Sequence, residues 1–290
     1  MLKNNVSFFF LFFLPSLHFG ANSDLECALA VDPSKIVVAG GSITEILYFI
    51  GEQNKIIGID VTSNYPKETE SIPSIGYVRN LSTEGVLSLN PTLILGENDM
   101  GPPMVVNQLR GVDVDLKIIP EDKTIEGIIE KILCIASIIG SGNKVDKIIR
   151  SDLLPMVDEI NYLKNKSIIK NKKVMLILSM TGVSPIVAGQ GTSGDAFIKM
   201  VGAQNIFDSF EGWKPVSEEA IIEKNPDFII IPSRDVHKNS DVKSITTNPI
   251  FKNTKAGKEN NFIFEDTMAM LGFGPRTIES ALKVVKQLSK

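Results

Sequence analysis

Short hydrophobic runs alternate with helical stretches along most of this chain of 290 residues. The first unit, KIVVAGGSITEILYFIG at 35–51, predicts an apolar strand, a glycine turn and a helix in which Ser42 and Glu45 have the spacing of a capping box. This alternation predicts an α/β fold with a mainly parallel sheet between layers of helices. Three more apolar strands follow, in KIIGIDV at 55–61, PTLILGE at 91–97 and VDLKIIP at 114–120.

The pattern changes twice in the second half of the chain. Residues 124–166 have helical periodicity and contain no strand candidate, and two glycines and Pro155 are expected to bend or cap this segment. A second series of strands and helices begins with KKVMLILS at 172–179 and closes with the helix RTIESALKVVKQL. We therefore predict two α/β lobes, at 35–123 and 172–290, with the helical segment connecting them.

The amino terminus has a different character. Lys3 is followed by the apolar run VSFFFLFFLPSLHFG and the small, polar ANSD, which predicts a secretory signal peptide over residues 1–23 and a periplasmic location. Pro15 interrupts the run, which is shorter than the roughly 20 apolar residues of a membrane span. An uncleaved amino-terminal anchor is the alternative. A lipoprotein signal is not predicted, because Glu26 stands before Cys27 where a lipobox has a small residue.

Composition limits the possible functions. A hydrophobic content of 43% is sufficient for real cores, and a net charge of −4 without a basic, aromatic-rich cluster argues against nucleic-acid binding. The two cysteines, Cys27 and Cys134, are too few to build a disulfide framework, and the sequence leaves open whether they pair. Cys134 lies in the helical stretch IIEKILCIASIIG and is expected to be a small buried hydrophobic residue.

A repeated pattern supports the division into two lobes. The segments STEGVLSLNPTLILG and SEEAIIEKNPDFIII share a serine, a glutamate two residues later, a proline seven residues after the glutamate, and an apolar strand. The glutamates are Glu84 and Glu219, one in each predicted lobe. A helix, an Asn-Pro turn and a strand are common parts, but their matched order indicates that the lobes repeat one unit.

Few enzyme signatures are present. After the predicted signal peptide one histidine is left, His237, so a histidine-rich zinc site or a Ser-His-Asp triad lacks candidates, and there is no G-x-S-x-G elbow. The glycines of GQGTSG, Gly189, Gly191 and Gly194, match the dinucleotide fingerprint, with Asp208 further on. Only the short strand PIVA precedes them, and an exported protein meets little NAD. An NAD(P)-dependent enzyme is kept as an alternative of a different class.

The loop SIGYVRNLSTEG carries the most distinctive chemistry. Tyr77 follows a glycine, and Arg79 stands two residues later. A tyrosinate is a hard anionic ligand for ferric iron, and tyrosine binds haem iron in catalase. Forming the phenolate costs free energy at neutral pH, and a neighbouring guanidinium lowers that cost by favouring the charged form. The alternative is a tyrosine at the edge of the core beside a solvated arginine.

Several segments resemble the periplasmic haem-binding components of bacterial haem ABC importers, in the class of binding proteins that serve iron complexes and vitamin B12. These segments, which lie between residues 35 and 290, are GYVRNLSTEGVLSLNP, SITEILYFIG, GQGTSGDAFIKMVGAQNI, WKPVSEEAIIEKNPDFIII and LGFGPRT. The resemblance implies two Rossmann-like lobes joined by a rigid helix, with the ligand in a cleft between them. It implies a monomeric protein that catalyses no reaction, captures haem and delivers it to an ABC permease and its ATPase.

The resemblance also assigns residues to the cleft. Tyr77 matches the axial haem ligand, and Arg79 matches the arginine that supports its phenolate. Arg234, in PSRD, matches a second cleft arginine that pairs with haem propionates or with Tyr77, the alternative being a solvated arginine. Trp213 follows a glycine before the second repeat, as Tyr77 does before the first. It is expected to face the cleft from the opposite lobe, the alternative being a buried core tryptophan.

The repeated glutamates have a separate expected role. By resemblance, Glu84 and Glu219 each offer a carboxylate to arginines of the permease. A glutamate in the first turn of a helix is also favoured by the macrodipole, by about 0.3–1 kcal/mol, so each alone would be unremarkable. Their equivalent positions favour docking.

Relatives with a second axial ligand use a histidine of the carboxyl-terminal lobe, and the corresponding region here has only His237. A lone loop histidine is more often solvated. Thioether sulfurs suit ferric iron poorly, so we expect five-coordinate haem bound by Tyr77 alone. The methionines considered for this position are Met180, Met268 and Met270.

Two points are left with alternatives. Arg276, in GFGPRT, follows a proline suited to the first turn of a helix, and both a structural role and a role in the cleft fit this position. An iron-siderophore or cobalamin carrier would keep the two lobes and the docking glutamates without needing a phenolate ligand.

Overall fold

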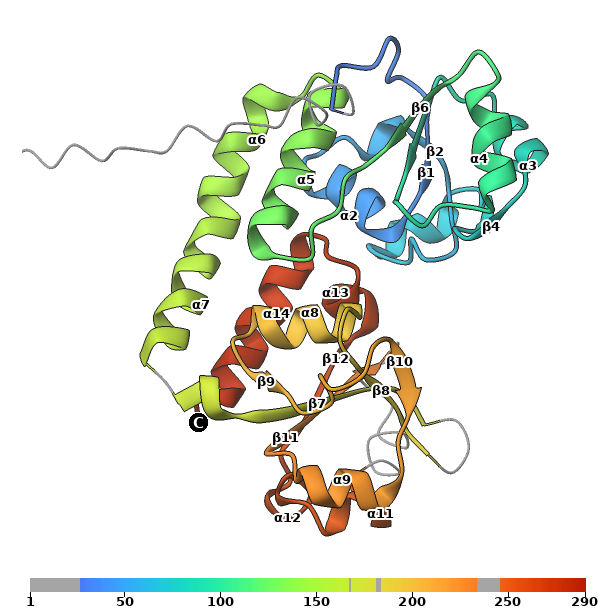
Figure 1. Ribbon diagram of the computed structural model, residues 1–290. Coiled ribbons are helices and arrows are strands. Elements are labelled where there is room, and N and C mark those ends of the chain that lie inside the picture. The colour runs from blue at the N-terminus through green and yellow to red at the C-terminus, as the bar shows by residue number, and fades with distance from the viewer. Residues whose placement is uncertain (1–26, 167, 181–183, 234–245) are drawn as a thin grey trace, which may run out of the picture.

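A parallel sheet of four strands forms the centre of the first lobe. The computed structural model describes residues 27–166, 168–180, 184–233 and 246–290. Figure 1 shows two lobes with a long helical segment along one side. The parallel arrangement predicted for this lobe is confirmed. The strands, in the order β2-β1-β5-β6, are β1 (Ile36–Ala39), β2 (Ile56–Ile59), β5 (Leu93–Gly96) and β6 (Asp115–Ile118).

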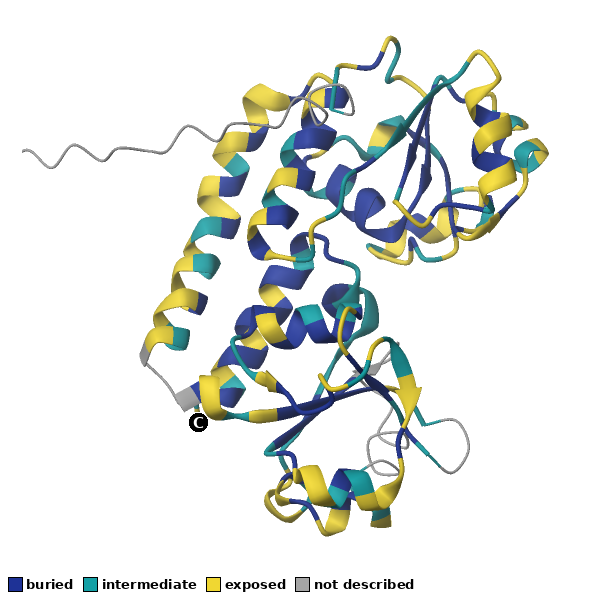
Figure 2. Cartoon of the chain, in the orientation of Figure 1, coloured by how far each residue is buried: buried dark blue, intermediate teal, exposed yellow. Residues whose placement is uncertain are grey.

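Helices cover both faces of this sheet, and the central strand β1 is completely buried (Figure 2). Ile36 and Val38 belong to one core cluster with residues of α2 and α5, whereas Val37 and Ala39 belong to another with residues of α3 and α4. Side chains alternate along a strand, so a strand buried on both faces reads as a continuous apolar run. The helices are α2 (Gly41–Phe49), α3 (Thr83–Leu87), α4 (Pro103–Arg110) and α5 (Ile125–Ile138), with short helical turns η1 (Gln53–Lys55) and η2 (Lys67–Ser71).

The second lobe contains a mixed sheet in the order β10-β8-β7-β11-β12, with β9 also pairing with β7. Strand β11 is parallel to β7 and β12, but β8 is antiparallel to both β7 and β10. The sheet is therefore mainly parallel, as predicted, with an antiparallel edge formed by β8 and β10. The strands are β7 (Lys173–Ser179), β8 (Ile186–Ala188), β9 (Gln204–Asn205), β10 (Trp213–Pro215), β11 (Phe228–Ser233) and β12 (Phe262–Asp266).

The helices of the second lobe also pack on both faces of its sheet. Val174 and Leu176 of β7 share a core cluster with α8 and α14, while Met175 and Ile177 pack in a cluster with α9, α11 and α12. These helices are α8 (Ser193–Met200), α9 (Glu218–Lys224), α11 (Pro249–Lys252), α12 (Lys255–Glu259), α13 (Thr267–Leu271) and α14 (Pro275–Leu288).

The segment that connects the lobes is α6 (Gly142–Ile148), a π-helical turn η3 (Ile149–Leu153) and α7 (Leu154–Lys166), followed by the short turn η4 (Ile168–Asn171). The helix continues through Pro155, which was expected to bend or cap it. Proline has no amide hydrogen to donate, and the wider π turn directly before α7 accommodates it. The predicted connecting segment began at residue 124 and so included α5, which packs against α2 of the first lobe. The predicted domain boundaries stay a prediction. In the described part of the chain no helix is long and apolar enough to cross a membrane.

One hydrophobic cluster runs through both lobes. It includes Val38 of β1, Ile132 of α5, Ile160 of α7, Ile278 of α14 and Leu176 of β7, all fully buried. Helix α14 packs against α7, α13, α2 and α5 and so contacts both lobes (Figure 1). The lobes are therefore joined by side-chain packing as well as by the connecting helix.

Candidate functional site

The loop that carries Tyr77 forms a small hairpin at the carboxyl ends of the first lobe's strands. Its strands, β3 (Gly76–Tyr77) and β4 (Asn80–Leu81), pair Tyr77 with Asn80. The Gly101 amide donates to the Val78 carbonyl at 2.9 Å, and the Leu81 amide donates to the Gly101 carbonyl at 2.9 Å. The loop that follows β5 therefore fixes the hairpin by backbone hydrogen bonds.

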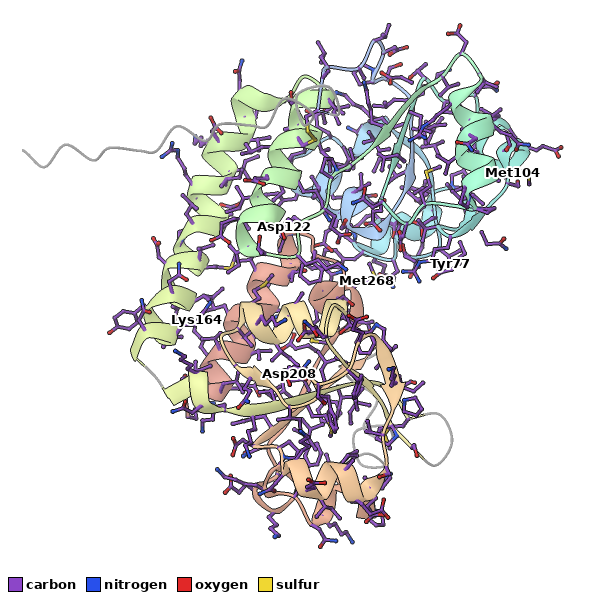
Figure 3. The ribbon with its side chains drawn as sticks, in the orientation of Figure 1. Tyr77, Met104, Asp122, Lys164, Asp208 and Met268 are labelled. Atoms are coloured by element: carbon purple, nitrogen blue, oxygen red, sulfur yellow. A yellow bond between two sulfur atoms is a disulfide. The ribbon has the colours of Figure 1, made fainter. Side chains whose placement is uncertain are left out.

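Tyr77 is 42% exposed, although Ile75, two residues earlier, is buried. Figure 3 places it at the margin of the first lobe that faces the second lobe, with Met268 of α13 across from it. Gly76 has φ of 94°, a left-handed conformation that favours glycine and directs the chain into the hairpin. The fixed hairpin therefore presents the phenol at the surface of the first lobe.

Arg79 pairs with Asp99. Its Nε and Nη2 atoms donate to the same Asp99 oxygen, Oδ2, at 2.7 and 2.6 Å. Hydrogen bonding to Asp99 raises the pKa of Arg79 further above its ordinary range, and the charge of Tyr77 makes a smaller contribution in the same direction. Tyr77 and Arg79 thus lie on the same hairpin, and Asp99 is the partner of the guanidinium.

A second polar group lies between the lobes. The Ser42 amide and hydroxyl donate to Glu97 Oε1 at 3.2 and 2.6 Å. Lys131 Nζ, which is almost fully buried, donates to the Ser42 hydroxyl at 3.2 Å and to the Phe273 carbonyl at 3.3 Å, and lies 3.7 Å from Glu121. Burial raises the pKa of Glu97 to about 7 against the opposing attraction of Lys131. This network joins α2, α5 and the loop before α14.

Arg276 connects the lobes at the start of α14. The Arg276 amide donates to Glu45 Oε1 at 2.8 Å, its Nε donates to Glu45 Oε2 at 2.9 Å, and its Nη1 donates to Asp266 at 3.2 Å. Its guanidinium carbon lies 3.6 Å from the centre of the Tyr65 ring. Burial raises the pKa of Glu45 despite the attraction of Arg276. Arg276 therefore has a structural role, one of the two alternatives that its motif allowed.

The capping box predicted within α2 is wrong. Helix α2 begins at Gly41 after the N-cap residue Gly40, with no side-chain cap. Ser42 and Glu45 have tertiary partners instead, Glu97 and Arg276. Correct spacing was not sufficient, because each side chain is drawn to a charged group from a distant part of the chain.

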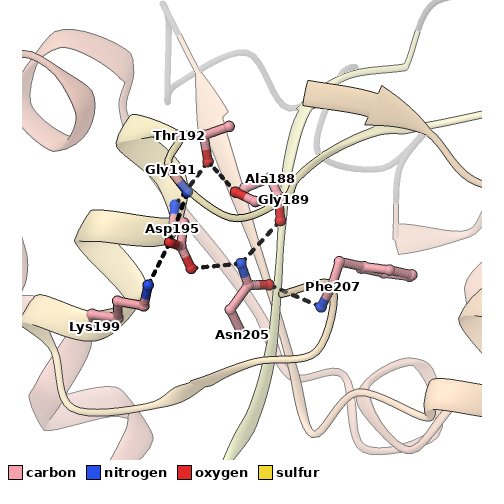
Figure 4. Close-up of polar contacts among 8 residues, drawn as sticks. All are labelled: Ala188, Gly189, Gly191, Thr192, Asp195, Lys199, Asn205 and Phe207. Atoms are coloured by element: carbon pink, nitrogen blue, oxygen red, sulfur yellow. Dashed lines mark hydrogen bonds and ion pairs between the residues drawn. The ribbon is translucent and has the colours of Figure 1, made fainter. Parts of the chain in front are cut away.

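The glycines of GQGTSG have structural roles in the loop between β8 and α8 (Figure 4). A Cβ on Gly189 would lie 2.4 Å from the Phe210 ring, and Gly191 has φ of 78°. The Gly191 amide donates to Asp195 Oδ2 at 3.1 Å, so it is already bound to a carboxylate. Because β8 is also antiparallel to its neighbours, the loop lacks the parallel strand of a dinucleotide fingerprint.

Asp195 is the centre of the hydrogen bonds in this loop. Lys199 Nζ donates to its Oδ2 at 2.7 Å, and Asn205 Nδ2 donates to its Oδ1 at 2.9 Å and to the Ala188 carbonyl at 3.0 Å (Figure 4). Its pKa is lowered, because the hydrogen bonds from Lys199, Asn205 and Gly191 outweigh the effect of burial. Asp208, the acidic residue that follows the glycine motif in the sequence, also lies within the second lobe (Figure 3).

Trp213 begins β10 and is half-buried. Its Cη2 atom would lie 2.7 Å from a Cβ on Gly194, and its ring packs against the large core cluster. Gly212 has φ of 76°, so a left-handed glycine precedes Trp213 as Gly76 precedes Tyr77. The structure gives no contact between Trp213 and Tyr77, and a position in the cleft stays a prediction.

The two repeats have the same local structure. Ser82 and Ser217 are N-cap residues, and their hydroxyls accept from the amides three residues on at 2.9 and 3.3 Å. Glu84 and Glu219 are thus the second residues of α3 and α9, and both are exposed. In each repeat the asparagine before the proline has φ near 50°, 49° at Asn90 and 48° at Asn225.

Other predicted site residues are distributed differently. Arg234 and His237 lie outside the described residues. Met270 is fully buried, Met180 packs against the second lobe's core, and Met268 is half-buried with its Cε atom near Gly41. The described residues contain no cluster of three or more His, Cys, Asp or Glu suited to a metal ion.

Cys27 and Cys134 form a disulfide with Cα atoms 4.9 Å apart. The expectation that Cys134 is simply a buried hydrophobic residue is therefore wrong in its chemistry, although the residue is 5% exposed. The bond ties the first described residue to α5, where the Ala30 amide also donates to the Ile138 carbonyl. A disulfide-bonded Cys27 has no thiol available for a lipid anchor.

A model of the periplasmic binding protein family matches residues 36–267. The chain belongs to this family. Two solved structures are similar to this chain over nearly their whole length. HutB of Vibrio cholerae, a periplasmic heme-binding protein, is 30% identical, with a TM-score of 0.77 over 89% of this chain and 100% of that one. RhuT of Roseiflexus sp. RS-1, also described as a periplasmic heme-binding protein, is 29% identical, with a TM-score of 0.78 over 88% and 98%.

A relative with a different ligand is also similar to this periplasmic binding protein. The vitamin B12-binding protein of Salmonella typhi is 23% identical over 61% of this chain and 65% of its own length. The similarity to HutB and RhuT confirms the two-lobed α/β fold predicted from the sequence.

Sequence reasoning missed Asp99, Glu97 and Lys131. Glu97 and Asp99 directly follow β5, and ligand-binding residues in α/β proteins gather at the carboxyl ends of parallel strands. That position was a usable signal. Lys131 gave no such signal, because a lysine within an amphipathic helix is normally read as solvated.

Proposed function

We propose that this protein binds haem between its lobes through the phenolate of Tyr77 and delivers it to an ABC permease and its ATPase. The observation that carries the proposal is the half-exposed Tyr77 on a hairpin fixed by the loop after β5, with the Arg79 guanidinium two residues away. Similarity to heme-binding proteins at 29–30% identity over nearly the whole chain supports haem as the cargo.

The chemistry of the pair fits ferric haem. A phenolate is an anionic oxygen ligand suited to Fe(III). The charge of Arg79 favours the anionic form of a nearby phenol, and the iron itself favours it more strongly once bound. Trp213 and Arg234 remain the proposed partners of the macrocycle and its propionates. Haem is cargo in this scheme, and no reaction is catalysed.

Export and docking complete the proposal. Residues 1–23 act as a signal peptide, and the Cys27–Cys134 disulfide is consistent with an oxidising compartment such as the periplasm. Glu84 and Glu219, exposed at equivalent helix starts in the two lobes, contact basic residues of the permease. The protein acts as a monomer.

Titration with haemin tests the proposal. Wild type is expected to give a saturable change in the haem absorption bands, which Tyr77→Phe loses because the ring is kept and only the ligand oxygen is removed. Tyr162→Phe, which removes the hydroxyl of another exposed tyrosine on α7, is the matched control and should bind as wild type. Equal binding by wild type and Tyr77→Phe would remove Tyr77 as the ligand. Binding of cobalamin or a ferric siderophore in place of haemin would favour the other carriers of the class.

A further inference from the structure

The ion pair between Arg79 and Asp99 has an arrangement that bears on how firmly cargo is held. Both guanidinium atoms in the pair, Nε and Nη2, bind the single oxygen Oδ2 of Asp99. The described structure gives no hydrogen bond from Arg79 to Tyr77, although Tyr77 ends β3 and Arg79 lies in the turn between β3 and β4. Arg79 is therefore paired with a carboxylate rather than with the phenol.

This pair is able to exchange partners. The side chains of Arg79 and Asp99 are 62% and 42% exposed, and exposed ion pairs are weak because water and salt screen them. The backbone around them does not depend on the pair, since Gly101 holds the hairpin by two hydrogen bonds of its own. The guanidinium can leave Asp99 while the hairpin and the loop keep their places.

A ligand-bound Tyr77 would offer Arg79 a second anion. A phenolate and a carboxylate both accept charge-assisted hydrogen bonds from a guanidinium, so the two anions compete for one cation.

We propose that Asp99 is a positioning residue that competes with the cargo-bound Tyr77 for Arg79, and that it thereby weakens the retention of haem. The inference rests on the proposed function. A carrier has to release its cargo at the permease, and a carboxylate that competes for the supporting cation favours release.

The test is Asp99→Asn, which keeps the size of the side chain and removes its charge. Haem affinity is expected to rise about two- to fivefold, the range that corresponds to an exposed ion pair. Transfer of haem to an excess of apomyoglobin should slow by a similar factor, and the tyrosinate-to-iron charge-transfer band should shift. Damage to the fold would weaken binding, so tightening separates positioning from a merely structural role. Asp113→Asn, which removes an exposed charge before β6 in the same lobe, is the control and should leave both measurements unchanged.

A double-mutant cycle tests whether Asp99 acts through Arg79. Arg79→Ala alone should weaken haem binding, and adding Asp99→Asn to it should then have little effect. If Asp99→Asn tightens binding equally with and without Arg79, its charge acts directly on Tyr77 and the proposed competition is wrong. Unchanged or weaker binding by Asp99→Asn alone would also overturn it.

These outcomes are distinct from failure of the proposed function. If wild type does not bind haemin, or if Tyr77→Phe binds it equally well, the proposed function fails. If wild type binds haemin through Tyr77 and Asp99→Asn does not tighten binding, the inference about Asp99 fails alone.

Discussion

Glu45, in the first lobe, binds the amino end of a helix in the second lobe through Arg276. One carboxylate oxygen accepts from the Arg276 amide at 2.8 Å, and the other accepts from Arg276 Nε at 2.9 Å. Both side chains are largely buried, at 8% and 17% exposure. The residues are 231 positions apart in the chain, so the contact depends on the correct placement of one lobe against the other.

Removing this carboxylate should destabilise the protein strongly. Glu45→Ala leaves the Arg276 amide and guanidinium without their partner in a largely buried site, which typically costs about 3–5 kcal/mol. Glu45→Gln keeps one acceptor and should cost less. Urea unfolding at neutral pH measures the change. Glu279→Gln breaks an exposed pair with Lys283 on the same helix and should change the free energy of unfolding by less than about 0.5 kcal/mol. A similar loss for both variants would contradict the structural role of Glu45.

Glu97 should make stability depend on pH. Its pKa is about 7 in the folded protein, raised by burial from an ordinary value of 4.5, so the folded state binds more protons between these values. Its contribution to stability is then fully present below pH 4.5 and is lost as the pH rises through 7. Relative to wild type, Glu97→Gln should gain about 1–3 kcal/mol of unfolding free energy between pH 4.5 and 8.

The comparison with wild type isolates Glu97, because the other titrating groups contribute equally to both proteins. A constant difference between wild type and Glu97→Gln across this range would mean that Glu97 is ionised in the folded protein at all these pH values.

The disulfide should contribute substantially to stability. It closes a loop with a sequence separation of 107 residues, and a bond over such a loop typically stabilises a protein by about 2–4 kcal/mol. The double variant Cys27→Ser with Cys134→Ala should lose this amount in urea unfolding, and a reducing agent should lower the stability of wild type but not of the variant. Mass spectrometry of the unreduced, alkylated protein should find no modified cysteine. Alkylation of either cysteine without reduction would refute the pairing.

The docking glutamates should affect transport without affecting binding. Glu84→Ala with Glu219→Ala is expected to leave haem affinity unchanged and to weaken association with the permease about tenfold, as expected for the loss of two exposed ion pairs. The control removes one exposed glutamate from each lobe elsewhere, in Glu70→Ala with Glu259→Ala. Equal transport by both double variants would exclude a docking role for the repeated glutamates.

The sequence predicted the strands that are buried on both faces. It missed the features that depend on residues distant in the chain. Strands β1, β5 and β11 were recognisable because burial on both faces makes them continuously apolar. The β3–β4 hairpin was read as a loop, since its strands have two residues each and Gly101 fixes them. The partners of Glu45 and Cys27 were unpredictable for the same reason, because they lie 231 and 107 residues away.

Part of the candidate site was accessible in the same way. Tyr77 and Arg79 were proposed because they are neighbours in the chain, and the repeated glutamates because each lies in the first turn of a recognisable helix. Asp99, the partner of Arg79, was missed because the path that returns the chain from β5 to the hairpin is a property of the fold. Arg234, proposed by resemblance, lies outside the described residues.

The hydrophobic cluster shared by both lobes has a mechanical consequence. Swinging one lobe away from the other would separate fully buried side chains of β1, α5, α7 and α14, and each such side chain costs about 1.5–3 kcal/mol to expose. The molecule should therefore respond to load as a stiff elastic body. Selection of cargo would depend on the shape that the two facing surfaces already have, and little of the binding free energy would be spent on closing them.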